Sequence, residues 1–229
     1  MTKLMYAVWG RELTSALRAP QLHAGLRGAG VDRLQLNLDD EGVAAAMRIA
    51  SAGGAHIGAV VSVWGEDPDA DRITRCLTGL DGVERVDGWR VEERRRLDPP
   101  ETWDGSRVDA LAQVALLRRP EELAHADWLH IWQVEHTGVA IRTQATFGYV
   151  QNIVQTTFTP RGDDVAALVE ELFVPAAIHD RHAFHGSAGD EAELARRSRE
   201  LMASVRRMGA DRDIDVVPTG RRLYDLRDL

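Results

Sequence analysis

Two tryptophans and a histidine recur at a spacing that suits one face of a helix. Trp128, Trp132 and His136 are four residues apart within Ala126–Thr143, which we predict to be helical. Side chains at i and i+4 lie above one another on an α-helix. A histidine at the end of a tryptophan-lined stripe suits a general base in an apolar pocket, because burial favours the neutral imidazole. The alternative is that both tryptophans pack in the core and His136 is a hydrogen-bonded residue at the helix end.

The next predicted strand, Thr146–Thr157, offers a hydroxyl and an amide after that helix. Tyr149 and Gln151 lie two residues apart, and side chains alternate between the faces of a strand, so they share a face. Such groups can orient a carbonyl or a phenol, or stabilise a developing oxyanion. An ordinary strand with a polar face explains the pattern equally well.

Two adjacent acids interrupt the apolar run Ala166–Phe173, which the pattern assigns to a strand or to one or two helical turns. On a strand, Glu170 and Glu171 point to opposite faces, and a buried carboxylate is costly unless it is paired. One of them is therefore a candidate acid or base, or a partner for His136. The sequence does not decide which of the two faces inward. Glu171, which shares a face with Phe173, is taken as the candidate, and an exposed edge carrying both acids is the alternative.

The remaining reactive side chains favour no further site. His179, His182 and His185 form an H-x2-H-x2-H pattern that does not converge on one ion, so we expect exposed histidines in a surface loop. Cys76, the single cysteine, excludes an intrachain disulfide and is expected to be a small apolar residue of a helix. Neither a glycine-rich phosphate loop nor a serine nucleophile elbow is present. We expect no cofactor and no metal.

Composition restricts the class of partner. Hydrophobic residues make up 44% of the 229-residue chain, and the formal net charge of -8 argues against nucleic acid binding. No run approaches the roughly 20 apolar residues that cross a bilayer. We expect a cytoplasmic protein with a small-molecule ligand and no membrane partner.

Apolar runs and alternation predict four strands in the first half of the chain. They are Leu4–Trp9, Asp32–Leu38, His56–Trp64 and Val83–Leu97. Helices are predicted at Glu12–Leu26, interrupted by Pro20, at Gly42–Ala50, followed by a break at Ser51–Gly54, and at Asp67–Leu80. The charges of Glu92–Arg96 indicate a solvated strand edge. The proline-containing segment Asp98–Gly105 is the predicted linker.

The second half repeats this order. Its predicted strands are Ala110–Leu117, Thr146–Thr157, Ala166–Phe173 and Ile214–Val217, and its long helices are Ala126–Thr143 and Asp190–Met208. Both halves therefore have a β-α-β-β-α-β order, which indicates an internal duplication and a ferredoxin-like arrangement. We predict two domains, residues 1–98 and 106–229. One such sheet leaves a face uncovered, so two sheets packed face to face are expected.

The order Trp128, Trp132, His136 and then Phe147–Asn152 resembles the EthD family over about Leu111–Val217. In that family a tryptophan-rich helix ends in a histidine and a Tyr-x-Gln strand follows. The first half resembles a degenerate second unit that has His23 but lacks both motifs. The resemblance implies an α+β barrel of the dimeric α+β barrel type, formed here within one chain. It also implies a superfamily of cofactor-free decarboxylases, dehydratases, isomerases and monooxygenases acting on aromatic or polyketide-like compounds.

The sequence therefore predicts a cofactor-independent lyase or isomerase for an apolar or aromatic carbonyl compound. His136 is the expected base, Tyr149 and Gln151 orient the substrate, and Glu171 is an acid or the partner of His136. Trp128 and Trp132 are the expected pocket walls. The alternative is a non-catalytic protein that binds a small apolar metabolite in the same pocket. Either a monomer or a homodimer is compatible with two ferredoxin-like halves.

Overall fold

Eight strands close into one antiparallel barrel. The computed structural model describes residues 1–51, 55–162 and 164–227, and within them the barrel order is β2-β3-β1-β4-β7-β8-β6-β9, with β9 pairing back to β2. The short strand β5 (Asp104–Arg107) adds to β9 outside this ring. The barrel strands are β1 (Thr2–Gly10), β2 (Arg33–Leu38), β3 (Ile57–Gly65), β4 (Val83–Leu97), β6 (Leu111–Arg118), β7 (Gly148–Thr157), β8 (Val165–Phe173) and β9 (Ile214–Asp225).

The two halves of the chain contribute four barrel strands each, in the same spatial order. The first half supplies β2-β3-β1-β4 and the second supplies β7-β8-β6-β9. The predicted α+β class is confirmed. Inner-face side chains of the two four-stranded sheets pack together in one core, as expected, among them Met5 and Val60 with Val114 and Leu168. The expectation did not include the pairing of the halves edge to edge through β4–β7 and β2–β9, which closes the barrel. Each half thereby satisfies the backbone groups that the other would leave unpaired at its edges.

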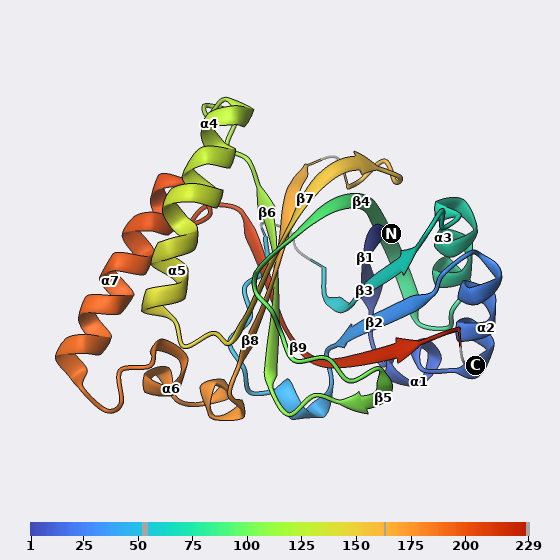
Figure 1. Ribbon diagram of the computed structural model, residues 1–229, viewed down its shortest axis with the longest axis horizontal. Helices are drawn as coiled ribbons and strands as arrows, with labels where there is room; N and C mark the ends of the chain where they lie inside the picture. Colours follow the sequence, from blue (N-terminus) through green and yellow to red (C-terminus); the bar gives the residue numbers. More distant parts are fainter. Residues whose placement is uncertain (52–54, 163, 228–229) are drawn as a thin grey trace.

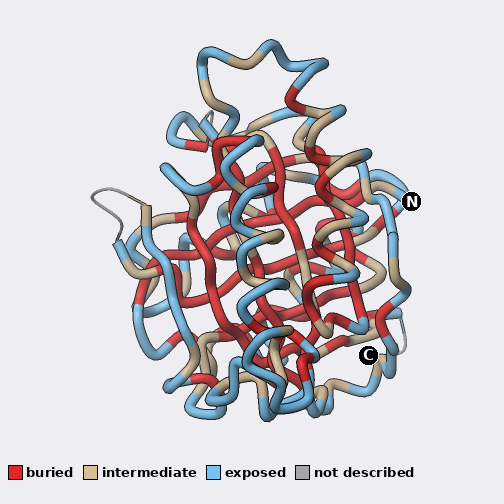
Figure 2. Tube along the Cα trace, turned by 90° about the vertical axis from the view of Figure 1, so that its left-hand side faces the viewer, coloured by how far each residue is buried: buried red, intermediate tan, exposed pale blue. Residues whose placement is uncertain are grey.

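Helices cover two opposite sides of the barrel (Figure 1). On the side of the first half lie α1 (Thr14–Leu17), α2 (Pro20–Gly28) and α3 (Ala70–Thr78). On the other side lie α4 (His125–His130), the π-helical η2 (Ile131–His136), α5 (Thr137–Thr143), α6 (Arg181–His185) and α7 (Glu191–Arg207). Two short 3-10 turns, η1 (Glu41–Val43) and η3 (Pro175–Ile178), complete the elements. Figure 2 shows this second side, with exposed outer helix faces over buried strands.

Pro20 acts as predicted: it ends the first helical segment and occupies the first turn of α2, where its missing N–H costs nothing. The segment Ala166–Phe173 belongs to strand β8, so of the two predicted alternatives, a strand or one to two helical turns, the strand is correct. No described helix has the length and apolar character that a membrane crossing requires.

Three expectations about local structure were wrong. The segment Gly42–Ala50 is not a helix beyond η1, because the backbone of Ile49 pairs with Val216 of β9 at 3.1 and 2.8 Å. The last strand runs eight residues past Val217, since its C-terminal part pairs with β2. Glu92–Arg96 is not a free edge, because β7 pairs with it. Of the predicted break at Ser51–Gly54, residues 52–54 lie outside the described residues.

A buried ionic network fills part of the barrel interior. Lys3, 4% exposed, places its Nζ 2.6 Å from Glu170 Oε1 and 3.3 Å from Glu93 Oε1. Asn152 Nδ2 donates to Glu170 Oε1 at 2.9 Å, and Gln35 donates to Glu170 Oε2. Burial opposes ionisation of Glu170, but the charge and hydrogen bond of Lys3 hold its pKa below the ordinary value. The lysine thus compensates two carboxylates that lie inside the barrel.

We predict that Lys3→Met destabilises the fold by about 3 to 5 kcal/mol, because it removes the cation that pairs directly with Glu170 and Glu93. Urea unfolding followed by circular dichroism measures the loss. Arg196→Ala is the control, since Arg196 pairs with Glu193 on the exposed face of α7 and should leave the midpoint unchanged. A loss below about 1 kcal/mol in Lys3→Met would show that the pair contributes no more than a surface ion pair.

Candidate functional site

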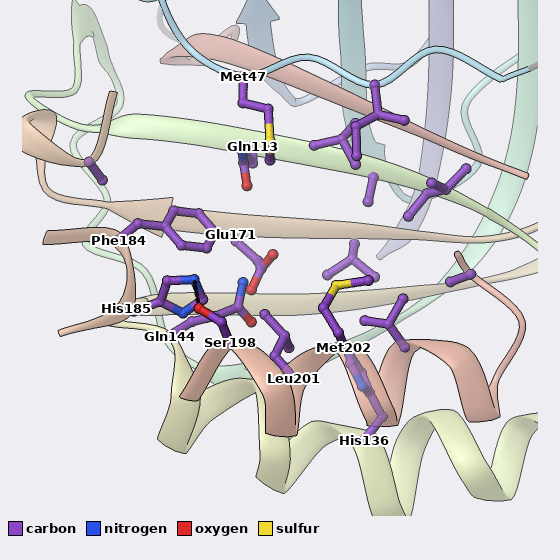
Figure 3. A pocket seen from close by; sticks show the side chains of 18 of the residues that line it. Met47, Gln113, His136, Gln144, Glu171, Phe184, His185, Ser198, Leu201 and Met202 are labelled. Carbon is purple, nitrogen blue, oxygen red and sulfur yellow. Dashed lines mark hydrogen bonds between the residues drawn. The ribbon is translucent and has the colours of Figure 1, made fainter. Parts of the chain in front are cut away.

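A cavity of about 520 Å³ lies between the outer face of the second-half strands and helices η2 and α7 (Figure 3). This volume is typical of a small-molecule site. Most of its wall is apolar and includes Leu117, Val169, Val205 and Ile214. On the side of the first half, the corresponding space under α2 and α3 is occupied by packed core side chains, among them Leu22, Leu26, Ile73 and Leu77.

Three polar side chains form a row across the floor of the cavity. Glu171 of β8 pairs with Gln113 of β6 on one side and with Tyr149 of β7 on the other. Residues directly opposite each other in neighbouring strands present their side chains on the same face. All three line the cavity. An amide, a carboxyl and a phenol therefore stand side by side on an otherwise apolar wall.

The structure assigns the two adjacent glutamates to opposite faces of β8. Glu170 points into the barrel onto Lys3, whereas Glu171 faces the cavity. Burial raises the pKa of Glu171 to about 7, and a hydrogen bond from Gln144 only partly offsets this effect. Among the described residues, the Oε1 atom of Glu171 is buried without a hydrogen-bond partner. Glu171 is thus populated in both protonation states near neutral pH, as proton transfer requires.

Tyr149 remains protonated beside this carboxyl. Burial raises its pKa, and the negative charge of Glu171 raises it further. The phenol is therefore a hydrogen-bond donor at neutral pH, next to a group that exchanges protons.

The predicted helix carries Trp132 and His136 into the cavity wall, but through a π-helical segment. In η2 the backbone pattern changes, and the Thr137 hydroxyl donates to the Trp132 carbonyl at 3.2 Å. Single π-helical turns within an α-helix are frequent at functional sites. His136 Nδ1 lies 2.9 Å from Ser204 Oγ, so its hydrogen-bond partner there is a serine on α7. Burial lowers the pKa of His136 to about 4, which makes it a weak base at neutral pH.

The structure places Trp128 and Gln151 away from the cavity lining. Trp128 stacks on Trp132, with ring centroids 5.3 Å apart, and donates to the Met208 carbonyl at 3.2 Å. Gln151 is fully buried; its Oε1 accepts from Arg96 at 2.8 Å and its Nε2 donates to Thr137 at 2.9 Å. These two side chains support the wall from behind. The lining contains His136, Tyr149, Glu171 and Trp132 from the predicted set.

Several polar lining residues were missed by the sequence interpretation. Among them are Gln113, Gln144, His185 and Ser198. Gln113 had a signal, since it interrupts the apolar alternation of Leu111, Ala115 and Leu117. The others come from a helix end, α6 and α7, and no local pattern joins them.

The three histidines differ in exposure, and the prediction was wrong for one. His179 is exposed and His182 is partly buried, but His185 is buried. The reason is that Phe184 stacks on Phe173 and thereby docks α6 against the barrel. Cys76 is partly buried against the first-half core. Within the described ranges, no three His, Cys, Asp or Glu side chains are grouped to hold a metal ion.

We predict that His136 makes the fold less stable as the pH falls. The unfolded chain takes up a proton near the ordinary pKa of 6.5, but the folded chain does so only near 4. Stability is therefore full above pH 6.5 and is lost between 6.5 and 4, by up to about 3 kcal/mol. Unfolding of wild type and His136→Gln should be compared at pH 7.5 and 4.5. A difference between the two proteins that does not change with pH contradicts the neutral, buried imidazole.

Comparisons with known proteins identify the fold alone. No family sequence model and no curated protein matches the chain. An anthrone oxidase-like protein has a similar structure, with a TM-score of 0.52 and 8% identity over 97% of this chain and 91% of that one. A proposed monooxygenase from Lactobacillus acidophilus NCFM gives 0.48 and 9% over 98% and 96% of the chains. The chlorite dismutase of Candidatus Nitrospira defluvii gives 0.44 and 11% over 99% and 92%.

The first of these similarities agrees with the barrel and helices described above, and it extends over nearly the whole of both chains. At 8% identity it carries no information on reaction or ligand. The chain therefore has an α+β fold in which an eight-stranded antiparallel barrel carries helices on two sides.

Proposed function

We propose that this chain is an enzyme that binds a mainly apolar small molecule in the cavity and transfers a proton on it with Glu171. The observation that carries the proposal is a carboxyl group with a pKa near 7 and an unpartnered oxygen, set in an apolar cavity. Perturbed carboxyl groups in concave apolar sites are the usual mark of acid–base chemistry.

The proposed substrate is an enolisable carbonyl compound. The ionised Glu171 takes a proton from the carbon next to the carbonyl group, and the electron pair of the C–H bond forms the enolate. Tyr149 and Gln113 flank Glu171 and are suited to donate hydrogen bonds to the enolate oxygen. Return of the proton to another carbon completes an isomerisation, whereas departure of a β-substituent completes an elimination. Both belong to the lyase and isomerase classes expected from the sequence.

The roles proposed for the other predicted residues change with their surroundings. His136, expected to be the base, is now proposed as a neutral hydrogen-bonding group of the wall, because burial weakens its basicity. Trp132 is proposed as an apolar wall. Trp128 and Gln151 are proposed to hold Trp132 and η2 in place rather than to contact substrate.

We also propose an EthD-like relationship and an origin by duplication. The equal strand order of residues 1–98 and 106–229 supports two ferredoxin-like units joined in one chain. The cavity beneath the tryptophan- and histidine-bearing helix supports the family resemblance in the second unit.

Exchange of carbon-bound hydrogen tests the proposed function without knowledge of the natural substrate. The probe is 2-tetralone, an enolisable apolar ketone, incubated with the protein in D₂O and followed by proton NMR. We expect exchange at least about 100-fold faster than in buffer alone, the lower end of general-base catalysis. Binding of the probe, measured by calorimetry, without accelerated exchange would favour the non-catalytic binding protein.

A further inference from the structure

A second polar pair in the cavity takes no part in the proposed proton transfer. His185 is the last residue of α6, and Ser198 lies on α7. His185 Nδ1 is 2.9 Å from the Thr143 carbonyl oxygen, and its Nε2 is 3.2 Å from Ser198 Oγ. Figure 3 shows Ser198, His185 and Gln144 at one end of the cavity, with Glu171 nearby.

The direction of these two hydrogen bonds follows from the donors and acceptors available. A carbonyl oxygen only accepts, so Nδ1 of His185 carries the hydrogen and donates it. Burial lowers the pKa of His185. The hydrogen bond to Thr143 raises it, but the nearby positive charges of Arg181 and Arg197 lower it further, so the net shift is downward. The imidazole is therefore neutral, and its Nε2 has a lone pair. The Ser198 hydroxyl must donate its hydrogen to that atom.

The pair is held rigidly. Arg197 Nη1 donates to the His185 carbonyl at 2.8 Å, and its Nε donates to Glu193 at 2.6 Å, which fixes α6 against α7. Thr143, which anchors His185, directly precedes Gln144, the hydrogen-bond partner of Glu171. The Ser198 hydroxyl and the Glu171 carboxyl are thus connected through adjacent residues at the same polar end.

We propose that Ser198, with its hydrogen held by His185, is a hydrogen-bond acceptor that selects ligands carrying an O–H or N–H donor at the polar end of the cavity. Ser198 lines the cavity, and within the part of the chain that the structure describes no hydrogen bond is donated to its Oγ. A ligand without a donor leaves this acceptor desolvated and unpaired, which costs more than an ordinary hydrogen bond gains. The inference rests on the proposed function only in using the same cavity, and it adds a hydroxylated ligand class.

Two probes of similar shape test this selection by calorimetry. 2-Naphthol offers a hydroxyl donor, and 2-methoxynaphthalene does not. We expect wild type to prefer 2-naphthol by about tenfold, and Ser198→Ala to remove this preference by weakening 2-naphthol alone. Ser198→Thr keeps the hydroxyl and should keep the preference. Equal weakening of both probes in Ser198→Ala, or an unchanged preference, overturns the proposal.

Nitrogen NMR of His185 supplies a readout that a purely structural role would not move. We expect the tautomer protonated on Nδ1, and the tautomer protonated on Nε2 would contradict the acceptor role of Ser198. Glu171→Gln separates this inference from the proposed enzyme. That variant should keep the preference for 2-naphthol even where carbon-bound hydrogen exchange is lost. Loss of the preference in Glu171→Gln would assign the selection to Glu171 and overturn the role of Ser198.

Discussion

Glu171→Gln is expected to reduce the exchange of 2-tetralone hydrogens in D₂O by about 100- to 1,000-fold. Glutamine preserves the size of the side chain and removes the proton-accepting carboxylate. In wild type the rate should rise with pH and level off above the pKa near 7, as Glu171 ionises. The variant should lose this inflection together with the rate.

The matched control is Glu135→Gln, another conversion of a glutamate on the second half of the chain. Glu135 lies on η2 but pairs with Arg207 and does not line the cavity. It should exchange the probe at the wild-type rate. If Glu171→Gln also retains that rate while its circular dichroism is unchanged, Glu171 is not the base.

A large side chain at Ala115 is expected to exclude ligands from the cavity. Ala115 lies on β6 two residues beyond Gln113 and lines the cavity floor opposite Val169. Ala115→Phe should weaken binding of 2-naphthol by at least about 100-fold, since the ring would occupy the space used by the apolar part of the ligand. The fold should survive because the ring enters existing space rather than a packed core.

Calorimetry with Ala115→Phe and Ala195→Phe provides the comparison. Ala195 is exposed on α7, so the same ring there leaves the cavity open. Wild-type affinity in Ala115→Phe would show that the ligand binds elsewhere, whichever reaction follows.

Short-range periodicity predicted the strands that carry the site. The two-residue alternation placed Tyr149 on one face of β7 and placed Glu171 on the same face of β8 as Phe173, but it did not decide which of Glu170 and Glu171 is the functional acid. The register between strands is what brings Glu171 beside Tyr149 and Gln113, and it depends on pairing among three separate segments. The sequence pattern could therefore predict the face on which each side chain lies. That Glu171 lies between Gln113 and Tyr149 follows only from the pairing of the strands in the barrel.

The four-residue helical spacing did not predict which of the two tryptophans lines the cavity. Trp128 and Trp132 share the same spacing, yet only Trp132 reaches the lining, because Trp128 packs beneath Met208. The π-helical turn at η2 depends on a shifted backbone hydrogen bond that side-chain spacing does not reveal. The residue spacing could not predict the low pKa of His136 either, because this pKa depends on burial of the imidazole against α7 near Ser204.

The residues from α6 and α7 had no local signal. His185 and Ser198 are 13 positions apart and meet because Phe184 docks on Phe173. The first half of the chain also contributes to the wall, through Met47 and Ile49, since the backbone of Ile49 pairs with Val216. Long-range docking of this kind follows from tertiary packing and not from the pattern of any one segment.

The pKa of the Glu171 carboxyl tests the central claim most directly. Carbon NMR of protein labelled at the glutamate side-chain carboxyl, with Glu171→Gln to identify the signal, gives its titration curve. We predict a midpoint near pH 7, because the cavity desolvates the carboxylate. A midpoint near the ordinary glutamate value of about 4.3 would show a solvated carboxyl and contradict its proposed role in proton transfer.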